Sequence, residues 1–272
     1  MAVTMAEISK LRTMTGAGMM DCKKALTEAN GDIDQAIELI RKRGQAIAAK
    51  RSDREASEGC VLAGMQGNFA AIVALKCETD FVAKNADFIG LTQLILDNAL
   101  EQKPADLEAL NNLIVDGRTL SALVTDRSGV TGEKMEIGFY EFVQDGTVVG
   151  YIHPGNKLAT IVSFAEEGID AQVARDIAMQ AAAMNPVALN RDAVPAEVVA
   201  RELEIGRDKA RQEGKPEAIL DRIAEGRLNK FFQEFTLVEQ DFIKDSKVTV
   251  AAYAQANGAT PSAFKRITLN QE

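Results

Sequence analysis

The side chains that most often carry enzyme chemistry are scarce in this 272-residue chain. It contains three cysteines, Cys22, Cys60 and Cys77, and one histidine, His153. The cysteines are widely spaced and form no CxxC pair, so neither a disulfide framework nor a zinc site with Cys and His ligands is expected. A single histidine also leaves little for general acid–base catalysis. We therefore expect these four residues to have structural roles, with no bound metal or cofactor.

The sequence also lacks the common motifs of nucleotide-binding and hydrolytic enzymes. It has no GxxxxGK[ST], HExxH or GxSxG segment. Gly16-Ala17-Gly18 resembles the start of a dinucleotide-binding loop, but Asp21 stands where the third glycine should be and no buried strand precedes it. These observations favour a binding or regulatory protein over an enzyme.

Charge is distributed unevenly along the chain, which carries 31 Lys and Arg against 40 Asp and Glu, a net charge of −9. Residues 1–54 hold ten basic against seven acidic side chains, so this part carries +3 and the remainder −12. This change in net charge, together with the polar sequence RSDREASEG at 51–59, predicts a domain boundary near residue 54. A basic module could bind nucleic acid, but the acidic remainder and the lack of aromatic residues before Phe69 argue against direct nucleic-acid binding.

Membrane association and secretion are not predicted either. No apolar run approaches the roughly 20 residues that a spanning helix requires. The opening sequence MAVTMAEISKLR has no long apolar stretch after a basic start, so it does not resemble a secretory signal. The cytoplasm is therefore the expected location.

Hydrophobic periodicity predicts three short helices in a first domain of residues 1–54. They cover 7–14, 20–29 and a segment from Asp32, in which Ile33, Ile37 and Ile40 follow helical spacing. Glycines 16 and 18 break the first helix, and Asn30-Gly31 ends the second. We expect these helices to enclose a small core and to leave the loop GAGMM outside.

From Gly59 the period changes to that of strands. CVLAGMQGNFAAIVALKCET predicts two strands joined at 66–68, followed by helices over about 80–100 and 106–115. A second hairpin is expected in MEIGFYEFVQDGTVVGYIHPGNKLATIVSF, with turns at 145–146 and 154–156, followed by a helix at 171–184. Both stretches contain a Gly-Asn turn, a strand and an alanine-rich helix. We predict two related subdomains, 55–140 and 141–272, with chance similarity as the alternative.

Residues 195–229 have a different composition, with two charged helices joined at 213–216. Glycine ends the first and proline begins the second, so the short connection predicts an antiparallel helical hairpin within the second subdomain. The hairpin is equally compatible with an interaction surface, including one that forms a homodimer, and with packing on the core. After it, the chain predicts a short helix and a closing strand. The predicted fold class is α+β.

Two segments resemble the signature segments of the bacterial translation elongation factor Ts family: LRTMTGAGMMDCKKAL at 11–26 and CETDFVAK at 77–84. IAMQAAAMNP at 177–186 and GKPEAILDRIAEGRLNKFF at 214–232 extend this resemblance over nearly the whole chain. The resemblance implies an N-terminal domain of the ubiquitin-associated type, a core of two related subdomains and a protruding helical hairpin.

The resemblance also implies a function, guanine-nucleotide exchange on elongation factor Tu, with binding to its GDP-bound and nucleotide-free forms. The family's wedge corresponds to Thr79, Asp80, Phe81 and Val82. Phe81 would insert between helices of the GTPase domain, and Asp80 would help to displace its Mg²⁺. The alternative is that Thr79 or Asp80 caps a helix and Phe81 belongs to the core.

The same family resemblance implies two further contacts with the GTPase. One uses Arg12, Met19, Met20 and Lys23, and two consecutive methionines suit an adaptable interface, although Met20 could belong to the core. The other uses the helix that carries Gln180, where some family members have histidine. Longer members continue beyond the position of residue 272 into a helix that also touches the GTPase, a contact expected to be missing here. A nucleic-acid-binding factor and a ubiquitin-type peptide-binding scaffold are the rival interpretations, and the Thr-Asp-Phe-Val segment argues against the scaffold.

Overall fold

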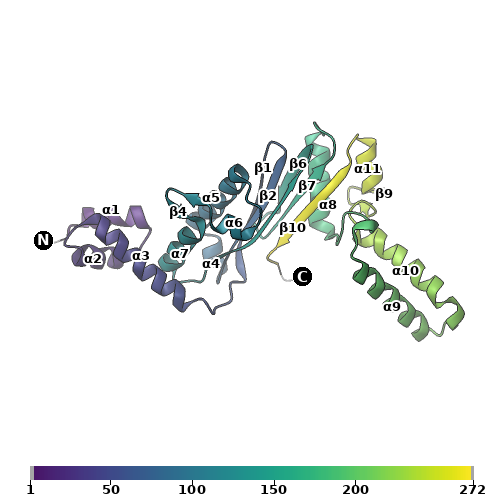
Figure 1. Ribbon diagram of the computed structural model, residues 1–272, viewed down its shortest axis with the longest axis horizontal. Helices are drawn as coiled ribbons and strands as arrows, with labels where there is room; N and C mark the ends of the chain where they lie inside the picture. The colour runs from purple at the N-terminus through teal and green to yellow at the C-terminus, as the bar shows by residue number, and fades with distance from the viewer. Residues whose placement is uncertain (1–2, 271–272) are drawn as a thin grey trace. The chain divides into compact units, whose positions relative to one another are not determined.

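The computed structural model describes residues 3–270, with the elements labelled in Figure 1. These residues divide into two compact units, one of residues 3–62, 73–140 and 269–270 and the other of residues 63–72 and 141–268. The ends of the predicted domains at 1–2 and 271–272 lie outside the described residues. The combination of helices with antiparallel strands confirms the predicted α+β class.

The three predicted N-terminal helices are present as α1 (Met5–Thr15), α2 (Met19–Glu28) and α3 (Ile33–Lys50). Thr4 and Glu7 form a reciprocal capping box at the start of α1. Gly16 ends α1 with a φ of +68°, a left-handed conformation that glycine adopts without steric cost. The helices enclose a small core that includes Ile8, Leu11, Cys22, Ala25, Leu26 and Ala36.

Helix α3 packs against α7 (Leu120–Thr131), a helix that the sequence analysis did not predict. Gly44 and Gly129 face each other where the two helices meet. A Cβ atom on Gly129 would overlap the backbone of Gly44, so this crossing depends on glycine. The sequence of α7, LSALVTDRSGVT, distributes polar and apolar residues all around the helix. Because no apolar stripe results, hydrophobic periodicity does not predict this helix.

The predicted helix over about 80–100 is two helices, α4 (Asp80–Ala83) and α5 (Ala86–Gln102). The single helix was wrong because the Asn85 side chain accepts a hydrogen bond from the amide of Asp87 and begins α5 anew. The predicted helix at 106–115 is also shorter, ending at Asn111 as α6 (Leu107–Asn111). Strand β3 (Ile114–Val115) then pairs with β4 (Arg118–Thr119) around a turn.

The first predicted hairpin is present as β1 (Glu58–Gln66) and β2 (Phe69–Cys77). The turn at 145–146, however, does not join a hairpin. Strand β5 (Glu136–Gln144) lies beside β2 in a sheet of order β1-β2-β5, whereas β6 (Thr147–Ile152) belongs to a sheet of order β10-β7-β6. Sequence alternation identifies a strand but not its partner, which explains the wrong pairing.

The sheet of the second unit contains the predicted hairpin with the turn at 154–156. Strand β6 pairs antiparallel with β7 (Leu158–Phe164), and the predicted closing strand, β10 (Pro261–Thr268), pairs with the other edge of β7. The predicted helix α8 (Ala171–Met184) packs on β6 and β7. Its buried side includes Val173, Ile177 and Ala181, which contact the same core as Val162 and Phe164.

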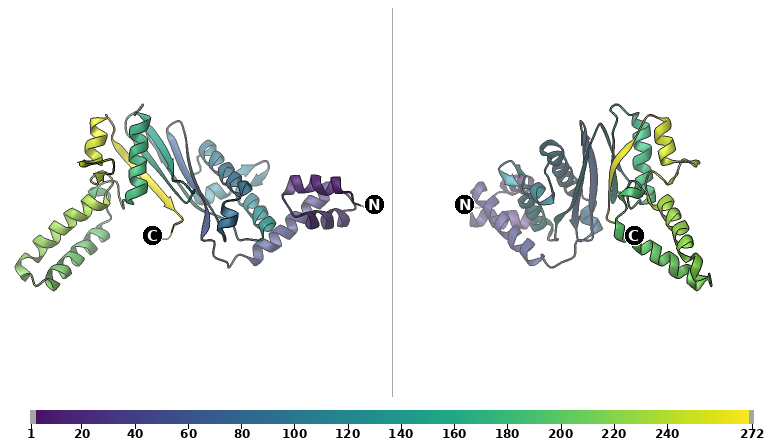
Figure 2. Two further views of the ribbon diagram at one scale, coloured as in Figure 1. Left: turned by 180° about the vertical axis from the view of Figure 1, so that it is seen from behind. Right: turned by 45° about the vertical axis from the view of Figure 1, so that its right-hand side comes forward.

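The predicted helical hairpin consists of α9 (Ala196–Gln212) and α10 (Leu220–Phe235), which lie side by side and extend away from the sheet of the second unit (Figure 2). The short turn between them contains the one-turn helix η2 (Glu217–Ile219). At the base of the hairpin, Phe232 packs with Ala188 and Val194. The short helix η1 (Arg191–Ala193) directly precedes Val194. Beyond the hairpin lie β8 (Asp241–Phe242), β9 (Asp245–Thr249) and α11 (Val250–Ala256).

Candidate functional site

The segment Thr79–Val82 leaves strand β2 and immediately forms the single turn of α4. Thr79 is the N-cap, and its hydroxyl accepts a hydrogen bond from the amide of Val82 at 3.4 Å. Phe81 is 84% exposed, so the core alternative for this ring does not describe the free protein. Burying an aromatic ring removes apolar area from water and is favourable, and an exposed ring lacks this stabilisation. Exposure of such a ring at the start of a short helix is therefore typical of a binding surface.

Asp80 directly precedes Phe81 in the sequence, and its carboxylate already has a cationic partner. Lys84 Nζ lies 2.7 Å from Asp80 Oδ2, an ion pair across one helical turn, with the Asp80 side chain 44% exposed. The hydrogen bond to Asp80 and its negative charge raise the pKa of Lys84. Because an exposed pair of this kind contributes at most about 1 kcal/mol, the carboxylate is available for another cation.

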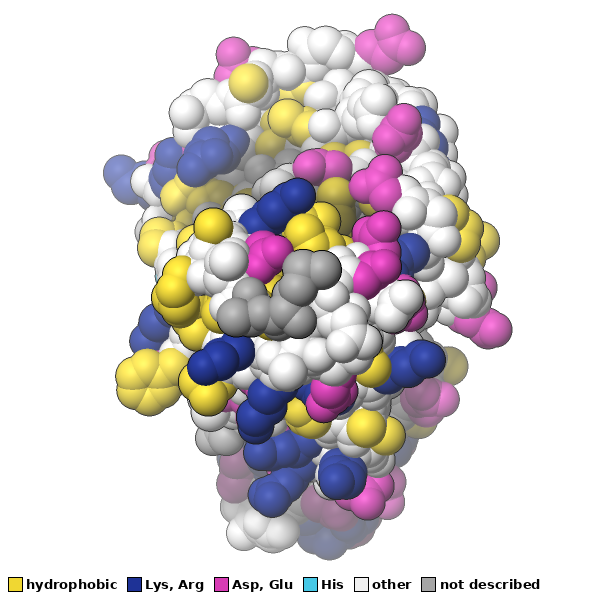
Figure 3. Space-filling model, turned by 90° about the vertical axis from the view of Figure 1, so that its left-hand side faces the viewer, with side chains coloured by type: hydrophobic (Ala, Val, Ile, Leu, Met, Phe, Trp, Pro, Cys, Tyr) yellow, Lys and Arg dark blue, Asp and Glu magenta, His cyan; other side chains and the backbone are white. Residues whose placement is uncertain are grey.

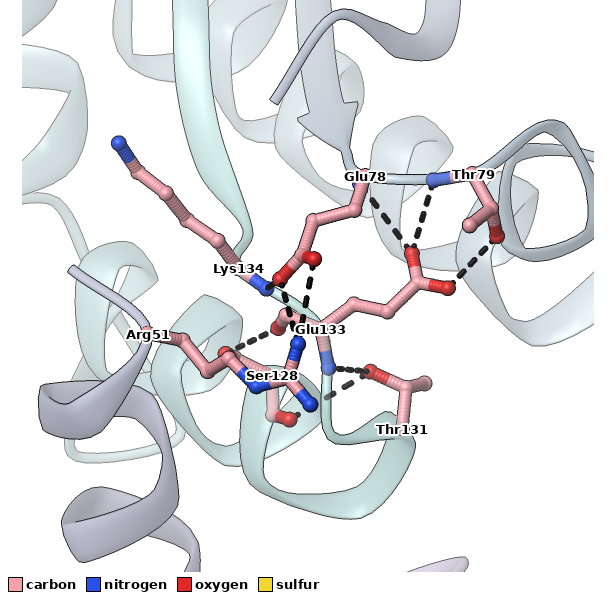
Figure 4. A network of polar contacts seen from close by, with 7 residues as sticks. All are labelled: Arg51, Glu78, Thr79, Ser128, Thr131, Glu133 and Lys134. Atoms are coloured by element: carbon pink, nitrogen blue, oxygen red, sulfur yellow. Dashed lines mark hydrogen bonds and ion pairs between the residues drawn. The ribbon is translucent and has the colours of Figure 1, made fainter. Parts of the chain in front are cut away.

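Thr79 is held by an acidic residue that the sequence analysis did not identify. The carboxylate of Glu133 accepts hydrogen bonds from the amides of Glu78 and Thr79 at 3.2 and 3.0 Å, and from the Thr79 hydroxyl at 2.6 Å (Figure 4). Glu133 follows α7 and lies 54 residues from Thr79 in the sequence. No local sequence pattern connects the two residues, so only the fold brings them together.

The residues of the predicted N-terminal contact all lie on the surface. Met19 is 36% and Met20 64% exposed, and the side chains of Arg12 and Lys23 are exposed as well. Met5 and Met14 add 62% and 55% exposed side chains from α1. Figure 3 faces this end of the molecule, where hydrophobic and basic side chains lie next to one another. Exposed thioethers are flexible, and together with the basic side chains of α1 and α2 they can adapt to a partner that offers apolar and acidic groups.

A cavity of about 220 Å³ lies where α3 meets α7, lined by residues that include Ile37, Ile40, Ile47 and Val130. Its polar wall contains Asp126, which forms an ion pair with Arg118 at 2.6 Å. Arg41 Nε lies 3.8 Å from the same carboxylate oxygen. The cavity is thus part of the packing between the N-terminal helices and α7.

Gln180 differs from the other predicted contact residues because its side chain is fully buried. Its amide nitrogen donates to Gln240 Oε1 and to the carbonyl of Asp241, both at 3.1 Å. Its amide oxygen accepts from the backbone of Ile243 at 2.8 Å. The side chain therefore supports the turn after β8, where Ile243 is 43% exposed, and offers no surface of its own to a partner.

The three cysteines are buried, whereas the histidine is exposed. None of Cys22, Cys60 and Cys77 forms a disulfide. Burial raises the pKa of Cys77 to about 12, with the charge of Glu133 as a second cause. His153 Nδ1 lies 3.1 Å from the hydroxyl of Tyr151. Within residues 3–270, no group of three or more Cys, His, Asp and Glu side chains could hold a metal ion, and no helix could cross a membrane.

Comparison with known proteins agrees with the family resemblance. A family profile described as Elongation factor TS matches residues 78–271, which include Thr79–Val82 and Gln180. An Elongation factor Ts of Porphyromonas gingivalis is 58% identical over 275 residues, covering 100% of both chains. That of Azobacteroides pseudotrichonymphae is 54% identical over 274 residues, with 100% of both covered. That of Amoebophilus asiaticus is 52% identical over 273 residues, covering 98% of this chain and 99% of the relative. On the strength of the profile and these full-length relatives, the chain belongs to the elongation factor Ts family.

Proposed function

We propose that this chain is a guanine-nucleotide exchange factor that binds elongation factor Tu and promotes the release of GDP, so that GTP can bind. Family membership supports the general role in translation elongation. The observation that carries the proposal is the 84% exposed ring of Phe81 on a capped helical turn. In this role the chain breaks no covalent bond, binds both the GDP-bound and the nucleotide-free GTPase, and acts in the cytoplasm.

Exchange follows from differential binding. If the chain binds the nucleotide-free GTPase more tightly than the GDP-bound form, thermodynamic linkage requires it to weaken GDP affinity by the same factor. Phe81 supplies this difference by inserting between helices of the GTPase domain when its nucleotide site opens. The exposed ring is removed from water only in the complex, so its burial stabilises the complex and not the free chain.

Asp80 acts at the Mg²⁺ that holds GDP in the partner. Carboxylate oxygens are ligands that Mg²⁺ prefers, and a competing carboxylate near the ion perturbs its coordination. The ion pair with Lys84 limits the motion of the Asp80 side chain in the free chain. Val82 is half-buried, and its amide donates to the Thr79 hydroxyl that caps the turn.

Two further surfaces contribute affinity in this proposal. Arg12, Met19, Met20 and Lys23 contact the GTPase domain from the N-terminal helices. In the second unit, Gln180 acts indirectly, because its three hydrogen bonds hold the turn that presents Ile243. A buried side chain that orders an exposed neighbour affects binding through preorganisation of that neighbour.

The test is to load elongation factor Tu with a fluorescent GDP derivative, add excess unlabelled GDP and follow the release of the label. A small amount of this chain should accelerate release, and the rate should saturate as its concentration rises. A GTPase from outside translation, loaded in the same way, is the matched control and should release GDP at its intrinsic rate. Unchanged release from elongation factor Tu at high concentrations of the chain would contradict the proposal.

A further inference from the structure

The segment that carries Phe81 is held by two acidic residues, Glu78 and Glu133, whose carboxylates accept hydrogen bonds from backbone amides across the contact (Figure 4). The carboxylate of Glu133 accepts from the amides of Glu78 and Thr79. In return, the carboxylate of Glu78 accepts from the amide of Lys134 at 2.7 Å. The connection between β2 and α4 is therefore tied twice to the turn between α7 and β5.

The hydroxyl of Thr79 transmits this clamp to α4. Its single proton points to Glu133 Oε1, with 2.6 Å between the oxygens. A lone pair on the hydroxyl oxygen is then available for the amide of Val82 at 3.4 Å. Glu133 thus sets the orientation of the group that caps the turn carrying Asp80 and Phe81.

The turn that supplies Glu133 is itself well supported. The Ser128 hydroxyl donates to the carbonyl of Glu133, and the amide of Glu133 donates to the Thr131 hydroxyl at 3.3 Å. Gly132 ends α7 in a left-handed conformation with a φ of +73°. On the other side of the clamp, Arg51 at the end of α3 lies 3.2 Å from Glu78. Glu133 is therefore a fixed point to which the more exposed segment is attached.

The exposed segment needs such support because it has little of its own. Helix α4 has four residues, and an isolated helical turn is not stable in water. The ring of Phe81, at 84% exposure, receives little packing that could orient it. Its direction depends on the backbone of α4, and that backbone is held at its start by Thr79 and thus by Glu133. Hydrogen bonds to an ionised carboxylate are among the strong ones, which suits Glu133 to this task.

We propose that Glu133 is a positioning residue for the exchange wedge: it holds Thr79 so that Phe81 is presented in its binding orientation before the partner arrives. This inference rests on the proposed exchange function. Without the carboxylate, the turn explores other conformations in the free chain. The partner must then order the segment on binding, which costs free energy that the clamped chain does not lose.

The first experiment measures the orientation of position 81 without any partner. The chain contains no tryptophan, so Phe81→Trp introduces the only indole fluorophore. Its time-resolved fluorescence anisotropy reports local motion of that side chain. We expect the amplitude of fast local motion to rise when Glu133→Gln or Glu133→Ala is combined with Phe81→Trp. Equal amplitudes in variants that remain folded by circular dichroism would overturn the inference.

The second experiment measures exchange in a double-mutant cycle. Glu133→Ala should slow GDP release from elongation factor Tu roughly tenfold, about 1.4 kcal/mol, and Glu133→Gln should retain part of the rate. In a Phe81→Ala background, Glu133→Ala should have little further effect, because the positioned ring is already gone. An equal effect in both backgrounds would show that Glu133 acts only through general stability and would overturn the inference.

A matched control and a second variant make these results interpretable. Glu136→Gln removes the same charge three residues away, but Glu136 is 42% exposed and pairs only with Lys76 and Lys134 among the described contacts, so exchange should stay normal. If Glu133→Ala fails to fold, Thr79→Val removes the hydroxyl that connects Glu133 to Val82 and should also slow exchange. If the wild-type chain does not accelerate GDP release, the proposed function is refuted. Normal exchange in Glu133→Ala, with slow exchange in Phe81→Ala, refutes only this inference.

Discussion

Replacing Phe81 by alanine is expected to slow GDP release strongly while leaving the free chain folded. Because the ring is 84% exposed, its removal costs the free chain little, within about 0.5 kcal/mol of folding free energy. Phe88 in α5 is the matched control, since it is the same residue type seven positions away and fully buried. Phe88→Ala should destabilise the chain by roughly 3 to 5 kcal/mol.

The effect on exchange is estimated from the area of the ring. A phenylalanine side chain buries roughly 200 Å² when it enters an interface. About four-fifths of this area is exposed in the free chain, and alanine would still bury a part of it. Removing roughly 120 Å² of apolar contact at about 25 cal/mol per Å² corresponds to about 3 kcal/mol. At 1.4 kcal/mol per factor of ten, GDP release should slow by on the order of 100-fold at concentrations below saturation.

The assay combines two measurements on the same preparation. Thermal unfolding followed by circular dichroism gives the melting temperature, and stopped-flow release of fluorescent GDP from elongation factor Tu gives the exchange rate. We expect Phe81→Ala to melt like the wild type and to exchange slowly. A lowered melting temperature with normal exchange per folded molecule would refute the reasoning, because Phe81 would then contribute to the fold and not to the interface.

Four other changes test the remaining parts of the argument. Met20→Ala removes a 64% exposed side chain and should weaken binding to elongation factor Tu about tenfold in a titration, without changing the melting temperature. Unchanged affinity would show that the N-terminal surface is not part of the interface. Gly129→Ala should lower the free energy of unfolding by roughly 1 to 3 kcal/mol in a denaturant titration, because the added Cβ overlaps Gly44. The control is Gly90→Ala on α5, where the added Cβ meets open space, and it should be neutral or slightly stabilising. Gln180→Leu removes the acceptor of the Ile243 amide and the donor to Gln240, and should cost roughly 1 to 3 kcal/mol of stability. Reduced binding at an unchanged melting temperature would contradict the supporting role. Replacing residues 201–226 by a short glycine linker should leave a chain that unfolds cooperatively on heating, because Val198 and Phe232 at the base of the hairpin remain. A broad, non-cooperative thermal transition would show that the hairpin belongs to the main core.

The elements that the sequence predicted well are those whose signals are local. Helix α8 has a clear apolar stripe, ends before Asn185-Pro186 and was predicted with its bounds at 171 and 184. The helical hairpin is likewise marked by Gly214 and Pro216, which stop one helix and permit the next. The family resemblance is local in the same way, because eight consecutive residues, 77–84, carry it as a linear motif, and the wedge role of Thr79–Val82 stays a proposal.

The features that only the tertiary structure revealed depend on contacts between distant residues. Alternation predicted β5 as a strand, but its pairing with β2 and not β6 depends on which edge is available in the fold. Gln180 lies in a recognisable segment, yet its burial follows from the packing of Gln240 and Ile243 some 60 residues later. Glu133 has no motif at all, and it meets Thr79 only because α7 and β5 bring the turn between them beside the end of β2. Local sequence determines which segments can form helices, turns and a recognition motif, because those preferences are set by neighbouring residues. The orientation of the motif is decided by the fold, because the hydrogen bonds that hold it come from elsewhere in the chain.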